Sequence, residues 1–146
     1  MTRVFIDASV LFSASLSPTG ASREIIRLAL RDQITLVASR LVFEETERNL
    51  ADKAPAALSA FEEFRNVVPF ELVRPTKRQV LQAASSTALK DAAIVAAAKR
   101  AKVDYLVSLD RRHLVRVPAV EKRSGLKIVL PKEIMEMIRR QISNAI

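Results

Sequence analysis

Short apolar runs alternate with longer segments of helical periodicity along the chain. The apolar runs predict strands at Arg3–Ile6, Ile34–Ala38, Tyr105–Leu109 and Lys127–Leu130, with a shorter one around Phe70–Val73. The periodic segments predict helices: one capped by Ser22, one capped by Ser39 and ending near Ala51, one over Pro55–Asn66, one from about Thr76 through Ala84, one opened by Asp91, and a last one from Pro131. This alternation predicts an α/β fold with three layers, α/β/α, around a mainly parallel sheet.

Length and composition narrow the class of protein. The chain has 146 residues, which suits a single domain over residues 1–146 with one continuous core. It contains no cysteine, which excludes a disulfide framework, a thiolate zinc site and thiol catalysis. The first ten residues lack the apolar core of a secretory signal, and no apolar run approaches the ~20 residues that span a bilayer. We therefore expect a cytoplasmic protein without a membrane partner.

The charge points to an anionic partner. The formal net charge is +8, which attracts phosphate backbones, although solubility alone is the alternative explanation. Aromatic residues make up 5% of the chain, so recognition by base stacking is not expected to dominate. The chain has only two glycines and no glycine-rich phosphate loop, which argues against nucleotide-cofactor enzymes.

Two aspartates stand immediately after predicted strands. Asp7 follows the first strand and Asp110 follows the strand that ends at Leu109. In open α/β sheets, ligands bind beyond the carboxyl ends of the strands, so both side chains are expected near the usual site. The alternative for each is a helix-capping or turn aspartate.

Two further acids lie on helices that begin near the same edge. At about 100° per residue, Glu45 falls between Leu41 and Val42 and faces inward, whereas Glu44 faces outward. The alternative to a functional role for Glu45 is a buried salt bridge to an arginine. Asp91 opens the most apolar helix, where the alternative is again a cap. If these junctions meet at one edge, the carboxylates repel one another unless a hard cation such as Mg2+ or Mn2+ lies between them.

A basic segment follows the last of these acids. We expect Arg111 to Lys127 to form a loop in which Arg111 and Arg112 contact a substrate backbone directly beside Asp110. The alternatives are a solvated loop or a surface that an acidic partner peptide covers. His113, the only histidine, is expected to be a surface residue.

Four segments together resemble a known family. These are VFIDASVLFSASLSPTGAS, ASRLVFEETERNL, KDAAIVAAAKRAKVDYLVSLDRRHL and KIVLPKEIMEMI. They are similar to PIN domains, the ribonuclease fold of the VapC-like toxins in toxin-antitoxin pairs. The third segment is the most specific, because an acid that opens an apolar, alanine-rich helix is followed by a strand ending in Ser, any residue, Asp.

The resemblance implies an activity and a set of site residues. It implies that Asp7, Glu45, Asp91 and Asp110 bind one or two Mg2+ or Mn2+ ions and catalyse RNA hydrolysis. It further implies that Ser9 and Ser108 orient the site, that an antitoxin protein is a partner, and that the chain forms a homodimer. The chain has Ala8 and Ser9 where many family members have threonine and asparagine, and Arg112 where some have a further acid.

Two other functions compete with a metal-dependent endoribonuclease. One is a response-regulator-like phosphohydrolase that is phosphorylated on Asp7, which is weakened because position 9 is a serine and not a second acid. The other is a non-catalytic basic α/β module that binds nucleic acid or a partner protein, with the acids acting as caps. Titration with Mn2+ separates this module from an enzyme, because isolated caps bind no ion.

Overall fold

The computed structural model describes residues 1–85, 87 and 89–145. The strands are β1 (Arg3–Ile6), β2 (Thr35–Ala38), β3 (Glu71–Leu72), β4 (Tyr105–Val107) and β5 (Ile128–Val129). The helices are α1 (Ala8–Leu16), α2 (Ala21–Leu30), α3 (Arg40–Lys53), the short 3-10 helix η1 (Pro55–Ala57), α4 (Leu58–Val67), α5 (Lys77–Ala83), α6 (Leu89–Arg100), α7 (Pro118–Ser124) and α8 (Pro131–Ala145). The predicted α/β class is thereby confirmed.

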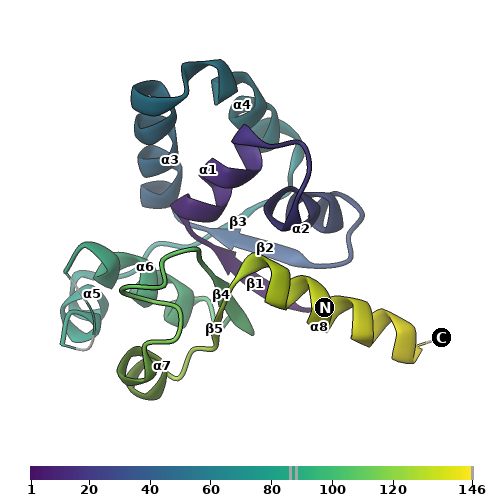
Figure 1. The fold of residues 1–146 in the computed structure, drawn as a ribbon. Helices are drawn as coiled ribbons and strands as arrows, with labels where there is room; N and C mark the ends of the chain where they lie inside the picture. The colour runs from purple at the N-terminus through teal and green to yellow at the C-terminus, as the bar shows by residue number, and fades with distance from the viewer. Residues whose placement is uncertain (86, 88, 146) are drawn as a thin grey trace.

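The sheet is parallel throughout and has the strand order β3-β2-β1-β4-β5. From β1 the chain moves outward to β2 and β3, then crosses back to β4 and β5 on the other side of β1. Because parallel crossovers are right-handed, this reversal places α1 to α4 on one face and α5 to α7 on the other (Figure 1). The terminal helix α8 packs against α2.

The central strands are apolar because both faces of the sheet are covered. Val4, Phe5 and Ile6 of β1 are fully buried, and so are Leu106 and Val107 of β4. Such continuous apolar runs are the mark of a strand buried on both sides, which is why the strand positions were predictable. Among the helices of the described residues, none combines the length and the apolar character needed to cross a bilayer.

Three local predictions were wrong. No helix was predicted at α1, because its sequence is apolar or small on every side and lacks the polar face that reveals helical periodicity. The second helix does not begin at Ser22, which is buried inside it; Gly20 is the N-cap residue. The segment from Arg111 to Lys127 is not all loop, because α7 begins at Pro118 and ends before Gly125, which adopts a left-handed conformation.

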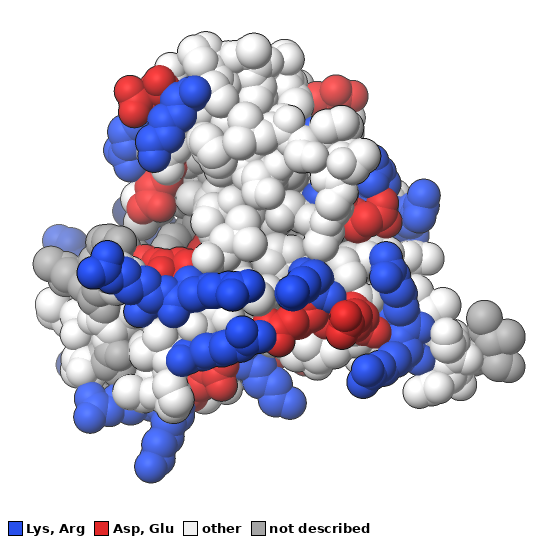
Figure 2. All heavy atoms as spheres, in the orientation of Figure 1, with Lys and Arg blue, Asp and Glu red and all other residues white. Residues whose placement is uncertain are grey.

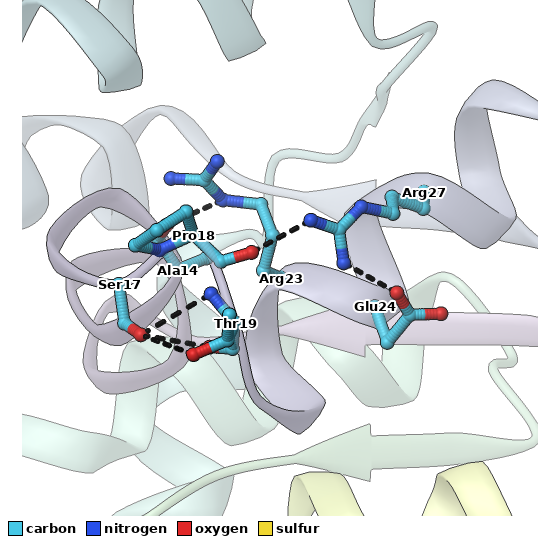
Figure 3. A network of polar contacts seen from close by, with 7 residues as sticks. All are labelled: Ala14, Ser17, Pro18, Thr19, Arg23, Glu24 and Arg27. Atoms are coloured by element: carbon cyan, nitrogen blue, oxygen red, sulfur yellow. Dashed lines mark hydrogen bonds and ion pairs between the residues drawn. The ribbon is translucent and has the colours of Figure 1, made fainter.

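The connection between α1 and α2 is fixed by two arginines of α2 (Figure 3). Arg23 Nε donates to the carbonyl oxygen of Ala14 at 2.7 Å. Arg27 donates to the carbonyl oxygen of Pro18 at 2.6 Å and also pairs with Glu24. The Ala14 carbonyl in the last turn of α1 and the Pro18 carbonyl in the loop are thus satisfied by side chains of the next helix.

Candidate metal centre

The candidate site lies where the direction of the chain reverses in the sheet. Strands β1 and β4 are neighbours, and Ile6 of β1 is level with Val107 of β4. From β1 the chain enters the helices on one face, whereas the helices beside β4 cover the other face (Figure 1). The carboxyl ends of β1 and β4 thus lie at a topological switch point, which is the usual ligand position in open α/β sheets.

Asp7 lies at this switch point, directly after β1. It is the N-cap of α1, and its Oδ1 accepts hydrogen bonds from Ser9 Oγ at 2.5 Å and from the Val10 amide at 3.2 Å. Only 6% of the residue is exposed. Burial raises the pKa of the Asp7 carboxyl, and hydrogen bonds from Ser108, Ser9 and the backbone oppose that rise. A carboxylate held this way favours a nearby cation, because the cation would offset the lost hydration.

Two serines connect the loop after β1 to the loop after β4. Ser9 Oγ, which donates to Asp7, also accepts from the Leu109 amide at 3.0 Å. Ser108 is fully buried; its hydroxyl opposes the rise of the pKa of the Asp7 carboxyl and accepts a hydrogen bond from the Asp110 amide at 3.0 Å. Ser9 thus connects Asp7 to the loop that carries Asp110.

Asp110 is held by the turn that follows it. Its Oδ1 accepts from the backbone amides of Arg112 at 3.1 Å and His113 at 3.0 Å. The same turn brings His113 Nδ1 to 3.2 Å from Asp110 Oδ2. One carboxylate oxygen is thus committed to the backbone, and the other faces the imidazole of His113.

Asp91, in the first turn of α6, joins these two side chains. Asp91, Asp110 and His113 each offer one ligand atom, and these atoms lie within 4.8 Å of one another. All three residues are half-buried. Two carboxylates and one imidazole at this spacing form a chemically reasonable set of donors for a divalent ion. Asp7 and Glu45 are not members of this group.

Glu45 lies on α3, which packs against both α1 and α6. The predicted orientation agrees with its burial, since Glu45 is half-buried and its neighbour Glu44 is exposed. Glu44 pairs with Arg40 at 3.3 Å on the surface. Of the predicted acids, the structure thus brings Asp91 and Asp110 together, links Asp7 through Ser9 to the loop that carries Asp110, and places Glu45 on the adjoining helix.

His113 is the residue that sequence reasoning undervalued. It was expected on the surface, yet it is half-buried against Asp110. The three-residue spacing between Asp110 and His113 could have indicated this contact, because a turn that begins at an aspartate brings the residue three positions later close to that carboxylate. Arg111 and Arg112 are both exposed directly beside Asp110.

Basic side chains gather over one half of the molecule. On the face shown in Figure 2, lysines and arginines form a band over the half that holds α5 to α8, and most of the half above it, over α1 to α4, is uncharged. On this face the positive charges are therefore unevenly distributed. The acidic centre lies in a protein whose basic half attracts polyanions.

The sequence matches one protein family, described as PIN domain, over residues 3–112. That match includes Asp7, Asp91 and Asp110. A comparison with curated proteins found no relative.

Solved structures share the fold at low sequence identity. The crystal structure of PAE2754 from Pyrobaculum aerophilum is 14% identical with a TM-score of 0.66, covering 95% of this chain and 90% of that one. VapBC2 from Rickettsia felis, bound to a DNA fragment from its promoter, is 13% identical with a TM-score of 0.63, covering 88% and 98%. The sarcin-ricin loop cleaving toxin VapC20 from Mycobacterium tuberculosis is 19% identical with a TM-score of 0.51, covering 70% and 86%.

Proposed function

The chain belongs to the PIN domain family, and from that premise we propose that it is a divalent-metal-dependent endoribonuclease. The observation that carries the proposal is the grouping of the ligand atoms of Asp91, Asp110 and His113 within 4.8 Å of one another. A strongly basic chain with a compact acidic centre suits a polyanionic substrate that is cut at a metal.

The residues at the centre would hold the ion in different ways. Asp91 and Asp110 supply carboxylate oxygens, and Asp7 adds a buried carboxylate that its two serines keep in position. A bound ion in such a site lowers the pKa of a coordinated water and stabilises charge on the phosphate. Glu45 on α3 is the remaining acid of the proposed set.

His113 bears on which ion is used. Mg2+ prefers oxygen ligands, whereas first-row transition ions also accept imidazole. The 3.2 Å between His113 Nδ1 and Asp110 Oδ2 is close to the separation expected of adjacent ligands around one ion, about 3 Å for bonds of about 2.1 Å. We therefore propose that Mn2+ binds this centre more tightly than Mg2+.

Arg111 and Arg112 have a proposed role in binding the RNA backbone. Both are exposed, and the amide of Arg112 is bound to Asp110, so their side chains start from the edge of the centre. Guanidinium groups in that position would contact the phosphates next to the bond that is cut.

We further propose that the protein acts as a toxin and that an antitoxin protein is its partner. This proposal is supported by family membership and by fold similarity to VapC20, described as a toxin, and to VapBC2. An acidic antitoxin segment would complement the basic half of the molecule. The homodimer and the cytoplasmic location stay predictions.

The proposal is tested with Asp91→Asn and a matched control, Glu44→Gln. Cleavage of a labelled single-stranded RNA should require Mn2+ or Mg2+, stop in EDTA, and fall at least ~100-fold in Asp91→Asn. Glu44→Gln also removes one negative charge, from an exposed position on α3, and should keep its activity. Metal-independent cleavage, or full activity of Asp91→Asn, would refute the proposal. Absence of Mn2+ binding in calorimetry would instead favour the non-catalytic module.

A further inference from the structure

A cavity of about 340 Å3 lies between α5, α6 and α7, apart from the candidate metal centre. Four basic side chains line it: Lys99 and Arg100 at the end of α6, Lys102 just after it, and Arg123 of α7. Within the described residues no aspartate or glutamate lines the cavity. We call these four residues and the cavity they surround the basic pocket.

The charges of the basic pocket are not neutralised by acids. Arg100 Nη1 donates to the amide oxygen of Gln79 at 3.2 Å, and Arg123 Nη1 donates to the carbonyl oxygen of Ser85 at 3.0 Å. These neutral partners orient the guanidinium groups and leave their charge in place. In the part of the chain that the structure describes, none of the four basic groups lies within ion-pair distance of a carboxylate.

Some arginines elsewhere on the molecule are paired with acids. Five of them form ion pairs with glutamates, namely Arg3 with Glu71, Arg27 with Glu24, Arg40 with Glu44, Arg65 with Glu47 and Arg116 with Glu133. The basic pocket therefore concentrates four uncompensated positive charges around one concave site. Such a site focuses an attractive potential for anions.

The shape and floor of the pocket suit a nucleotide. Its volume is within the usual range for small-ligand sites, about 300 to 1,000 Å3. Val95 and Ala96 are both buried and form an apolar floor, whereas the four basic side chains are exposed at the rim. An apolar floor under a cationic rim matches a nucleobase that is attached to phosphates.

The position of the pocket relates it to the metal centre through α6. Asp91 is in the first turn of α6 and Lys99 is in its last turn, eight residues further on (99 − 91 = 8). At 1.5 Å per residue this is about 12 Å along the helix. A few nucleotides of a single RNA strand cover that distance, so one strand can reach both sites.

We propose that the basic pocket is a second binding site for the RNA substrate, which holds a nucleotide and its phosphates a few nucleotides away from the bond that is cut. The proposal rests on the ribonuclease function proposed above, and it assigns substrate recognition to residues outside the metal centre. Binding at the pocket needs no metal, so it can be measured separately from cleavage.

The test uses the double variant Lys99→Gln/Lys102→Gln and a control with the same loss of charge, Arg48→Gln/Lys53→Gln. Both control residues are exposed on α3. The probe is a fluorescein-labelled single-stranded RNA of about a dozen nucleotides, and its anisotropy is measured in EDTA over a series of salt concentrations. Losing two phosphate contacts should raise the Kd of the pocket variant for RNA about tenfold or more. It should also reduce the magnitude of the slope of the logarithm of the association constant against the logarithm of the salt concentration by about 1.4.

Steady-state cleavage in Mn2+ gives a second readout. The pocket variant should show a raised KM with kcat within about twofold of the wild type, because its metal centre is intact. The proposal is overturned if the two double variants weaken RNA binding equally, or if the pocket variant binds RNA like the wild type. A wild-type protein that binds RNA through the pocket but cleaves none in Mn2+ would refute the ribonuclease function and leave the pocket as an RNA site.

Discussion

Replacing Asp7 with asparagine should make the metal-free protein more stable while it removes a group proposed to bind the ion. The carboxyl is almost fully buried, and its pKa is raised because desolvation outweighs the hydrogen bonds from Ser108, Ser9 and Val10. At neutral pH the folded state is therefore destabilised, because Asp7 must either be charged while buried or keep a proton that it loses in the unfolded chain. Asparagine has nearly the same shape and can accept the same bonds from Ser9 and Val10 without that cost.

The size of the effect follows from the burial of the site. Removing a buried, partly compensated charge is worth about 1 to 3 kcal/mol. A chain of this length gains about 3 °C in Tm for each kcal/mol, so we expect Asp7→Asn to raise Tm by about 3 to 9 °C near pH 8. Asp52→Asn, which removes a charge from an exposed position on α3, should change Tm by no more than about 1 °C.

The dependence on pH has a definite sign. As the pH rises above about 4, Asp7 ionises in the unfolded chain while the folded protein keeps the proton, so the wild type loses stability until the pH passes the raised pKa. Asp7→Asn lacks this loss. The two proteins should melt together below about pH 4 and diverge above it in thermal melts recorded in EDTA. A difference that does not vary with pH, or a variant less stable than the wild type at pH 8, would refute this account of Asp7.

Three further changes test other parts of the structure. His113→Gln should raise the Kd for Mn2+ at least tenfold in calorimetry. It should also abolish the nitrogen coupling in the electron spin echo spectrum of the bound ion. An unchanged Kd would show that His113 is not a ligand. In the wild type, Arg3 donates two hydrogen bonds to the Glu71 carboxylate and lowers its pKa, and Glu71→Gln removes this ion pair. The Tm of the variant should be lower than that of the wild type by less than about 3 °C at pH 7, and the two Tm values should become equal as the pH falls below about 4. Gly125→Ala should cost about 1 kcal/mol in urea unfolding, because φ is +76° there and an L side chain strains the backbone. Apart from the two neighbouring residues, no atom of the described chain lies within 4 Å of the added methyl group, and an unchanged midpoint would contradict the backbone strain.

The positions of the strands were predictable because a strand that is buried on both faces has a continuous run of apolar residues. The run at Arg3–Ile6 coincides with β1, and Ser39 caps α3 by accepting from the Val42 amide, as predicted. The same logic failed at α1, whose residues are buried on several sides and show no polar stripe. It also failed at α7, because the basic residues of this segment were interpreted as a loop although a helix begins at Pro118 and ends before Gly125.

Distances within the site could not be predicted in the same way. Helical phase gave the direction of Glu45 but not how far α3 stands from α6, because that depends on tertiary packing. His113 was missed for a related reason. Its place beside Asp110 is set by the turn after β4, which short-range patterns describe poorly.

The serine contacts between the loops after β1 and β4 join residues about a hundred positions apart in the chain, as in the bond from the Leu109 amide to Ser9. During synthesis, the first half of this centre leaves the ribosome long before the second half exists. No fragment that ends before Asp110 can assemble the group with Asp91 and His113. An incomplete chain that ends before Asp110 therefore lacks the candidate metal centre.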